Sequence, residues 1–135
     1  MKKKSRHPRL VRECLRLLCM SGITAYESKT MGVWDATRGV YRQNQRQRKG
    51  IADITACVPP NGKYLAVEIK IGRDSQSPDQ RNFQQDVEAV GGTYLLIRDT
   101  VDTLVGWLKG EKPVAVPQAA SLKQEPSMES HSRFQ

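Results

Sequence analysis

The sequence of 135 residues predicts a mixed α/β domain, with a central β-sheet flanked by helices. Segments of helical and strand periodicity follow one another in the order helix, three or four strands, helix, strand, helix. Two of those strands are joined by the tetrapeptide Pro-Pro-Asn-Gly, whose Asn-Gly pair is a strong signal for a β-hairpin. We expect one domain over residues 1–110 and a disordered tail over residues 111–135, where Pro, Ser, Gln and Glu dominate and periodicity stops.

Residues 8–21 are predicted to form the first helix. Pro8 suits a first helical turn and Gly22 suits the C-terminal stop. The helix carries an apolar stripe of Leu10, Val11, Cys14, Leu17 and Leu18. A short strand is expected over 23–27, and two more are expected within 31–42 about an Asp-Ala-Thr-Arg-Gly turn.

The hairpin consists of a strand over 51–58, a turn over 59–62 and a strand over 63–71. Alternation along the second strand separates an apolar face from a face that carries Glu68 and Lys70. The apolar face holds Leu65, Val67, Ile69 and Ile71, and the other face begins with Tyr64 and Ala66. The charged pair has two interpretations: the wet face of a half-buried strand, or a functional site.

The second half of the chain contains clear signals for the start and the end of a helix. Ser77 is the expected N-cap of a helix, Pro78 its first residue, and Gln80 completes a Ser-x-x-Gln capping box. Gly91 and Gly92 end that helix. The apolar strand 93–97 that follows should be buried on both faces, and a last short helix is expected over 100–108.

The distribution of charged and apolar residues limits the kinds of partner that we expect. Residues 1–49 hold 13 Lys and Arg against 3 acids, whereas residues 50–135 hold 9 against 11. Such a lopsided charge favours a polyanionic partner, foremost nucleic acid, with an acidic membrane or mere solubility as alternatives. No apolar run approaches the roughly 20 residues of a membrane span, and no apolar region follows the basic N-terminus. We therefore expect a cytoplasmic protein with no membrane partner.

Histidine and cysteine exclude further classes of site. The two histidines, His7 and His131, give chemistry based on paired histidines almost nothing to build on. An odd number of cysteines (Cys14, Cys19 and Cys57) without Cys-x-x-Cys spacing argues against a disulfide framework and a zinc site. We expect these cysteines to be small buried residues in a reducing compartment.

Three charged residues converge on the hairpin. Asp53 lies near the start of its first strand, and Glu68 and Lys70 share a face of the second. Two carboxylates make a hard-oxygen site suited to Mg²⁺, and a neighbouring lysine can orient a water or counter the charge on a phosphate. The stretch 42–49 has no apolar residue and would grip the nucleic-acid backbone through Arg42, Arg46, Arg48 and Lys49.

This pattern resembles a known family. "GIAD" (50–53), "EIK" (68–70) and "SPDQ" (77–80) opening a helix look like the PD-(D/E)XK nuclease superfamily, and more narrowly its VRR-NUC branch of small phage and bacterial nucleases. The resemblance spans about residues 8–108 and implies a nuclease-like mixed sheet flanked by helices. Ala52 departs from the motif, which has proline there.

The resemblance also implies roles for residues. Asp53 and Glu68 would bind Mg²⁺ or Mn²⁺ with the Ile69 carbonyl, Lys70 would be the catalytic lysine, and Gln80 would lie near the active site, although its capping role explains it equally well. The family's first helix usually supplies a glutamate to the metal. Candidates for that place here are His7, Glu13 and Glu27.

The expected function is therefore a metal-dependent, structure-selective DNA endonuclease, acting on branched double-stranded DNA such as four-way (Holliday) junctions. A flap or fork nuclease, a restriction-type or RNA-directed nuclease, and a non-catalytic nucleic-acid-binding module are the alternatives. Paired cuts on a four-way junction favour a homodimer. Leu10, Leu17 or Trp34 could supply its apolar contact, unless they pack in the core.

Overall fold

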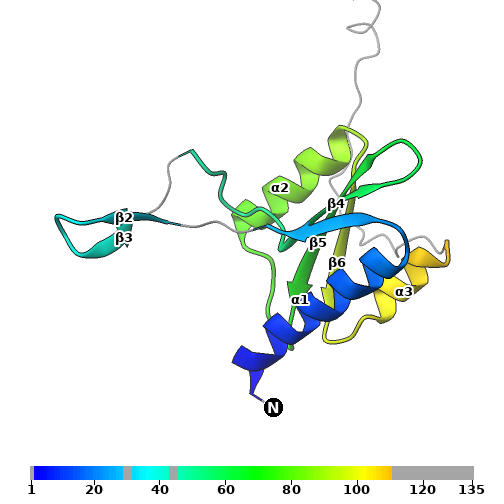
Figure 1. The fold of residues 1–135 in the computed structure, drawn as a ribbon, viewed down its shortest axis with the longest axis horizontal. Helices are drawn as coiled ribbons and strands as arrows, with labels where there is room; N and C mark the ends of the chain where they lie inside the picture. Colours follow the sequence, from blue (N-terminus) through cyan, green and yellow to red (C-terminus); the bar gives the residue numbers. More distant parts are fainter. Residues whose placement is uncertain (1, 29–31, 43–45, 111–135) are drawn as a thin grey trace, which may run out of the picture.

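A four-stranded mixed sheet forms the centre of the molecule in the computed structural model, which describes residues 2–28, 32–42 and 46–110 (Figure 1). The strand order is β1–β4–β5–β6. The bounds are β1 Thr24–Glu27, β4 Ile54–Val58, β5 Lys63–Lys70 and β6 Thr93–Arg98. β1 and β5 each run antiparallel to β4, and β6 runs parallel to β5. The parallel pair requires a crossover, which the helix α2 (Pro78–Ala89) supplies.

Helices cover both faces of this sheet (Figure 1). α1 (Lys3–Met20) and α3 (Asp102–Leu108) lie on one face, and α2 lies on the other. The larger core joins the stripe of α1 and Leu104 of α3 to the apolar face of β5. The smaller core lies under α2 and contains Ala52, Ala66, Phe83, Val87 and Tyr94. The predicted α/β class, with a mixed sheet between helices, is confirmed.

The first helix begins earlier than predicted. It starts at Lys3, so that Pro8 lies inside it rather than in its first turn. The backbone N–H groups of Ser5 and Arg6 already donate to the Lys2 carbonyl. Pro8 removes a single helical hydrogen bond near this end. The first turns also have tertiary partners, since Arg6 and His7 both contact acidic residues outside the helix.

The local signals for α2 and for the hairpin are confirmed. The Ser77 hydroxyl accepts from the Gln80 N–H, and the Gln80 side chain accepts from the Ser77 N–H, which is the predicted capping box. β4 and β5 are joined by residues 59–62, with Gly62 at a φ of 75° and its N–H donating to the Val58 carbonyl. β4 is shorter than predicted, and Asp53 directly precedes it.

A second, two-stranded ribbon projects from the body of the molecule (Figure 1). It consists of β2 (Val33–Asp35) and β3 (Val40–Arg42), which pair antiparallel about residues 36–39. The two short strands predicted within 31–42 are thus present, except that residue 31 lies outside the described residues. Trp34 is exposed over 55% of its surface, so it does not pack in the core.

The cysteines only partly follow the prediction. Cys14 is buried against the sheet, and burial raises the pKa of its thiol to about 12. Cys19 and Cys57 are exposed, with Cys19 in the last turn of α1 and Cys57 near the turn that joins β4 to β5. The predicted tail over 111–135 lies outside the described residues. Within the part of the chain that is described, no helix combines the length and apolar character needed to cross a membrane.

Candidate active site

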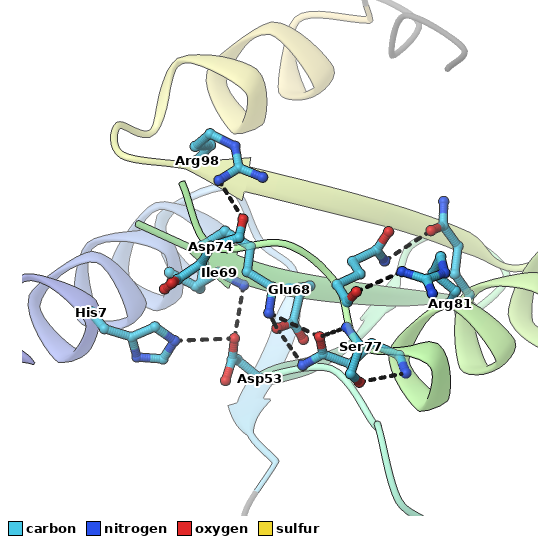
Figure 2. A network of polar contacts seen from close by, with 12 residues as sticks. His7, Asp53, Glu68, Ile69, Asp74, Ser77, Arg81 and Arg98 are labelled. Atoms are coloured by element: carbon cyan, nitrogen blue, oxygen red, sulfur yellow. Dashed lines mark hydrogen bonds and ion pairs between the residues drawn. The ribbon is translucent and has the colours of Figure 1, made fainter. Parts of the chain in front are cut away.

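The two predicted acids meet across the β4–β5 pair. Ile54 lies opposite Val67, so Asp53 and Glu68 are the next residues along the two strands. The Asp53 carboxylate accepts a hydrogen bond through Oδ2 from the backbone N–H of Ile69, at 2.8 Å. Figure 2 shows Asp53 turned toward β5, beside the labelled Glu68. The hairpin therefore places both carboxylates at one end of the sheet.

Glu68 is buried, with only 3% of its surface exposed. Its Oε2 accepts a hydrogen bond from Nε2 of Gln80 at 3.0 Å. Its Oε1 is also buried, and it has no hydrogen-bond partner among the described residues. The wet-face interpretation of Glu68 is therefore wrong, because α2 covers this face of β5. A buried carboxylate oxygen without a protein partner is costly, and a water, a proton or a cation would satisfy it.

Lys70 lies beside Glu68 and is also largely buried. Its Nζ donates to Oε1 of Gln80 at 2.9 Å and lies 3.5 Å from Oε2 of Glu68. Three donors are available on an ammonium group, so the lysine keeps hydrogen-bonding capacity beyond Gln80. The ammonium is thus held at a defined place next to the Glu68 carboxylate.

Gln80 serves the helix and the site at once. Its Oε1 accepts from the Ser77 N–H and from Lys70, while its amide nitrogen donates to Glu68. The two interpretations of Gln80 therefore do not exclude each other. The capping box sets the side-chain rotamer, and that rotamer carries the amide to the two charged residues of β5.

The electrostatics of the site are unbalanced. Burial, with the nearby Asp53 carboxylate as a second cause, raises the pKa of Glu68 to about 7, and the Lys70 ammonium only partly offsets this rise. A positive charge between the two carboxylates would counteract both causes and lower the pKa of Glu68. Burial and the negative charge of Glu68 also raise the pKa of Tyr94 well above its ordinary value, and the Tyr94 hydroxyl oxygen accepts a hydrogen bond from Nε2 of Gln76.

Of the three candidates for the first-helix ligand, the structure brings His7 to the site. Its Nε2 lies 3.5 Å from Oδ2 of Asp53, and Figure 2 shows the ring reaching from α1 toward that carboxylate. Glu13 instead pairs with Arg9 on the exposed side of α1. Glu27 lies opposite Ile54, and strand alternation puts it on the other face from Asp53.

The segment between β5 and α2 is held by contacts that the sequence did not indicate. Arg98 donates to the carbonyls of Gly72 and Asp74, and Arg81 donates to the carbonyl of Gln76 (Figure 2). Asp99, at a φ of 64°, accepts from the Gly72 N–H and pairs with Arg6 of α1. No motif marks Arg98 or Asp99, because their backbone partners lie 24 to 27 residues away in sequence.

Gly50 sets the approach to Asp53. A Cβ on Gly50 would lie 2.7 Å from the backbone nitrogen of Gln80, and its φ is 79°. The chain that leads to Asp53 therefore passes directly against the first turn of α2. Only glycine fits this position without moving one of the two segments.

The predicted DNA-binding residues do not form one uniform surface. Arg48 pairs with Asp86 of α2 at 2.6 Å and lies over the Phe83 ring, so its charge is already partnered. Arg42 lies 3.7 Å from Asp35 on the β2–β3 ribbon. Arg46 and Lys49 are exposed beside the path to Asp53. A role for these four residues in binding DNA stays a prediction.

The donor set fits a hard divalent cation. Among the described residues, no three or more His, Cys, Asp and Glu side chains group together as a metal cluster. Mg²⁺ needs only one or two carboxylates, since waters and substrate oxygens complete its shell. Asp53 and Glu68 supply that pair, with the unpartnered Oε1 of Glu68 as the group that lacks a ligand. The Ile69 carbonyl stays a predicted third ligand.

Comparison with known proteins leaves the family open. No protein-family model, no curated protein and no solved structure matches this chain.

Proposed function

We propose that the protein is a metal-dependent endonuclease for branched DNA, of the VRR-NUC branch of the PD-(D/E)XK nucleases. One observation carries the proposal: a buried glutamate with an unpartnered oxygen lies between an aspartate and a lysine that Gln80 holds in place. A structural salt bridge would satisfy both oxygens of a buried carboxylate. The arrangement is better suited to binding a cation and a phosphate.

Each residue has a defined task in this proposal. Asp53 and Glu68 bind the cation, and the Ile69 N–H keeps Asp53 turned toward β5. Lys70 donates hydrogen bonds to the attacking water or to a phosphate oxygen, where its positive charge opposes the negative charge of the transition state. Gln80 restricts the ammonium to that place. The chemistry that Mg²⁺ supplies when bound is polarisation of the phosphate and of a water.

The substrate class follows from charge and from the number of sites. The basic balance of residues 1–49 supports a polyanion. The part of the chain that the structure describes holds one such site, which would cut one strand at a time. Paired cuts on a four-way junction then need two copies, so we include a homodimer in the proposal.

The test is a cleavage assay on labelled flap, fork, four-way junction and plain duplex DNA, each with Mg²⁺ or with a chelator. We expect Mg²⁺-dependent cutting of branched DNA. Asp53→Ala, Glu68→Ala and Lys70→Ala should each abolish it while DNA affinity stays within a few-fold. Lys63→Ala is the matched control, because Lys63 begins the same strand β5 at its far, exposed end.

Two outcomes would contradict the proposal. Full activity in Glu68→Ala would remove the buried glutamate from the mechanism. Tight binding of all branched DNAs without cleavage under Mg²⁺ or Mn²⁺ would identify the alternative, a binding module with a nuclease-like site.

A further inference from the structure

The β2–β3 ribbon exposes two aromatic rings side by side. Trp34 and Tyr41 lie directly opposite each other in the strand pair, which puts them on the same face. Their ring centroids are 5.0 Å apart in an edge-to-face arrangement. They are exposed over 55% and 70% of their surfaces. Adjacent, exposed large aromatic side chains are unusual and mark a contact surface.

The ribbon is built to hold these rings without support from the core. Oδ1 of Asp35 accepts from the backbone N–H groups of Thr37 and Arg38, and the Asp35 carbonyl accepts from the Gly39 N–H. Gly39 closes the turn at a φ of 65°. A Cβ at Gly32 would lie 2.8 Å from the Arg42 carbonyl oxygen, so the start of the ribbon also needs glycine. Contacts within residues 32–42 are therefore sufficient to define the turn of the ribbon and the start of β2.

The charges of the ribbon favour an anionic partner. Arg38 and Arg42 flank the single acid Asp35, which is largely covered, whereas both arginines are more than half exposed. Further along the chain, Arg46 and Lys49 are exposed between the ribbon and the candidate active site. A second copy of this chain would bring like charges to the same place, whereas a nucleic acid brings the opposite charge.

We propose that Trp34 and Tyr41 stack on unpaired bases of the DNA substrate. In an intact duplex the faces of the bases are covered by their neighbours, so exposed rings of this kind can stack only where bases are unstacked. Arg38, in the turn of the ribbon, would contact the backbone of the same strand, whereas Arg42 lies on the opposite face, beside Val33. The inference rests on the nuclease function proposed above and adds to it a binding site for DNA with a single-stranded arm, such as a fork or a flap.

The test measures binding rather than cleavage, with Ca²⁺ in place of Mg²⁺. Fluorescence anisotropy would follow a labelled oligothymidine, a fork with single-stranded arms and a plain duplex. We expect Trp34→Ala/Tyr41→Ala to weaken binding of the oligothymidine and the fork by about tenfold or more, and binding of the duplex by less than about twofold.

Two control variants separate stacking from damage to the ribbon. Trp34→Phe/Tyr41→Phe keeps the rings and should bind all three DNAs like the natural protein. Val33→Ser/Val40→Ser changes exposed residues on the opposite face of the same strands and should do the same. Loss of oligothymidine binding in either control would overturn the proposal.

Other outcomes also overturn it. Unchanged oligothymidine and fork binding by the double alanine variant would remove the stacking role. If that variant also turned a dimer into a monomer, the rings would belong to an interface between copies. The nuclease proposal fails separately: natural protein that binds through these rings but cuts no DNA would keep the stacking role and lose the enzyme.

Discussion

Gln80 links two requirements in a single side chain. Its amide completes the cap of α2 and also contacts Lys70 and Glu68. Substitution should therefore affect stability and activity through different contacts, and a second residue of the cap allows the two effects to be separated.

We predict that Gln80→Ala and Ser77→Ala each destabilise the protein by about 1 kcal/mol through loss of the cap. Only Gln80→Ala should also lower the cleavage rate, by about tenfold or more, because Lys70 loses the acceptor that positions it. Urea unfolding and single-turnover cleavage measure the two effects. Equal rates for the two variants would limit Gln80 to capping.

The pH dependence of stability reports on Glu68. Its pKa is raised from 4.5 to about 7 in the folded protein. At a pH below the pKa that Glu68 has in the unfolded chain, the folded and the unfolded states both hold the proton. Glu68 then takes no free energy away from folding. As the pH rises from about 4.5 to about 7, the folded state retains a proton that the unfolded state releases, so folding loses free energy.

We predict that the chelator-treated protein loses about 3 kcal/mol from this residue between pH 5 and pH 8, and that Glu68→Gln does not. The measurement is the free energy of unfolding in urea at both pH values, compared between the two proteins. Mg²⁺ should reduce the loss, since a bound cation favours the ionised carboxylate. Parallel curves for the two proteins would contradict the raised pKa.

At the scale of the elements, the contact between the approach to Asp53 and α2 decides the geometry of the site. Gly50 combines a positive φ with a close neighbour in the first turn of α2. Gly22 has the same φ of 79° but no atom within 4 Å of an added Cβ. An alanine at Gly22 therefore tests backbone strain alone, whereas an alanine at Gly50 tests backbone strain together with a steric clash.

We predict that Gly22→Ala costs about 1–2 kcal/mol of stability and leaves cleavage unchanged. Gly50→Ala should cost more and should also reduce cleavage, because the first turn of α2 and Gln80 must shift. Thermal unfolding and the fork-cleavage rate are the readouts. A Gly50→Ala protein that behaves like Gly22→Ala would show that the loop moves without disturbing the helix.

Local chemistry explains which elements were predictable. The Asn61-Gly62 turn and the Ser77-Pro78-Gln80 start of α2 depend on neighbours in sequence, and both are present. The start of α1 was missed, since its first turns are stabilised by Asp53 and Asp99, far along the chain. The sequence left the exposure of Trp34 open, because hydrophobicity alone does not separate a core residue from a surface contact.

At the scale of the whole molecule, the proposed action on four-way junctions depends on how many copies of the chain assemble on the DNA. Leu10 is buried beneath α1, so it is unavailable as a contact between copies.

The candidate site was predictable from the sequence because its acids lie on one hairpin. The pairing of Arg48 with Asp86 was not, as it joins residues on separate elements.

We predict that two chains of 15.2 kDa assemble on one four-way junction. Multi-angle light scattering with Ca²⁺, with and without junction DNA, measures the mass, and plain duplex is the control. A mass of one chain under both conditions, together with cutting of forks or flaps, would assign the protein to those substrates and leave the active-site residues unchanged.

The contiguity of the site has a consequence for how the chain folds. Asp53, Glu68, Lys70 and Gln80 all lie between positions 53 and 80, and a four-residue turn brings the two acids together. Closing so short a loop costs little entropy, whereas docking α1 onto β5 joins segments separated by much more chain. We therefore expect Asp53 and Glu68, which repel each other, to come together before α1 docks and places His7 beside Asp53. Docking of α1 would then bring His7 beside two carboxylates that the hairpin has already placed together.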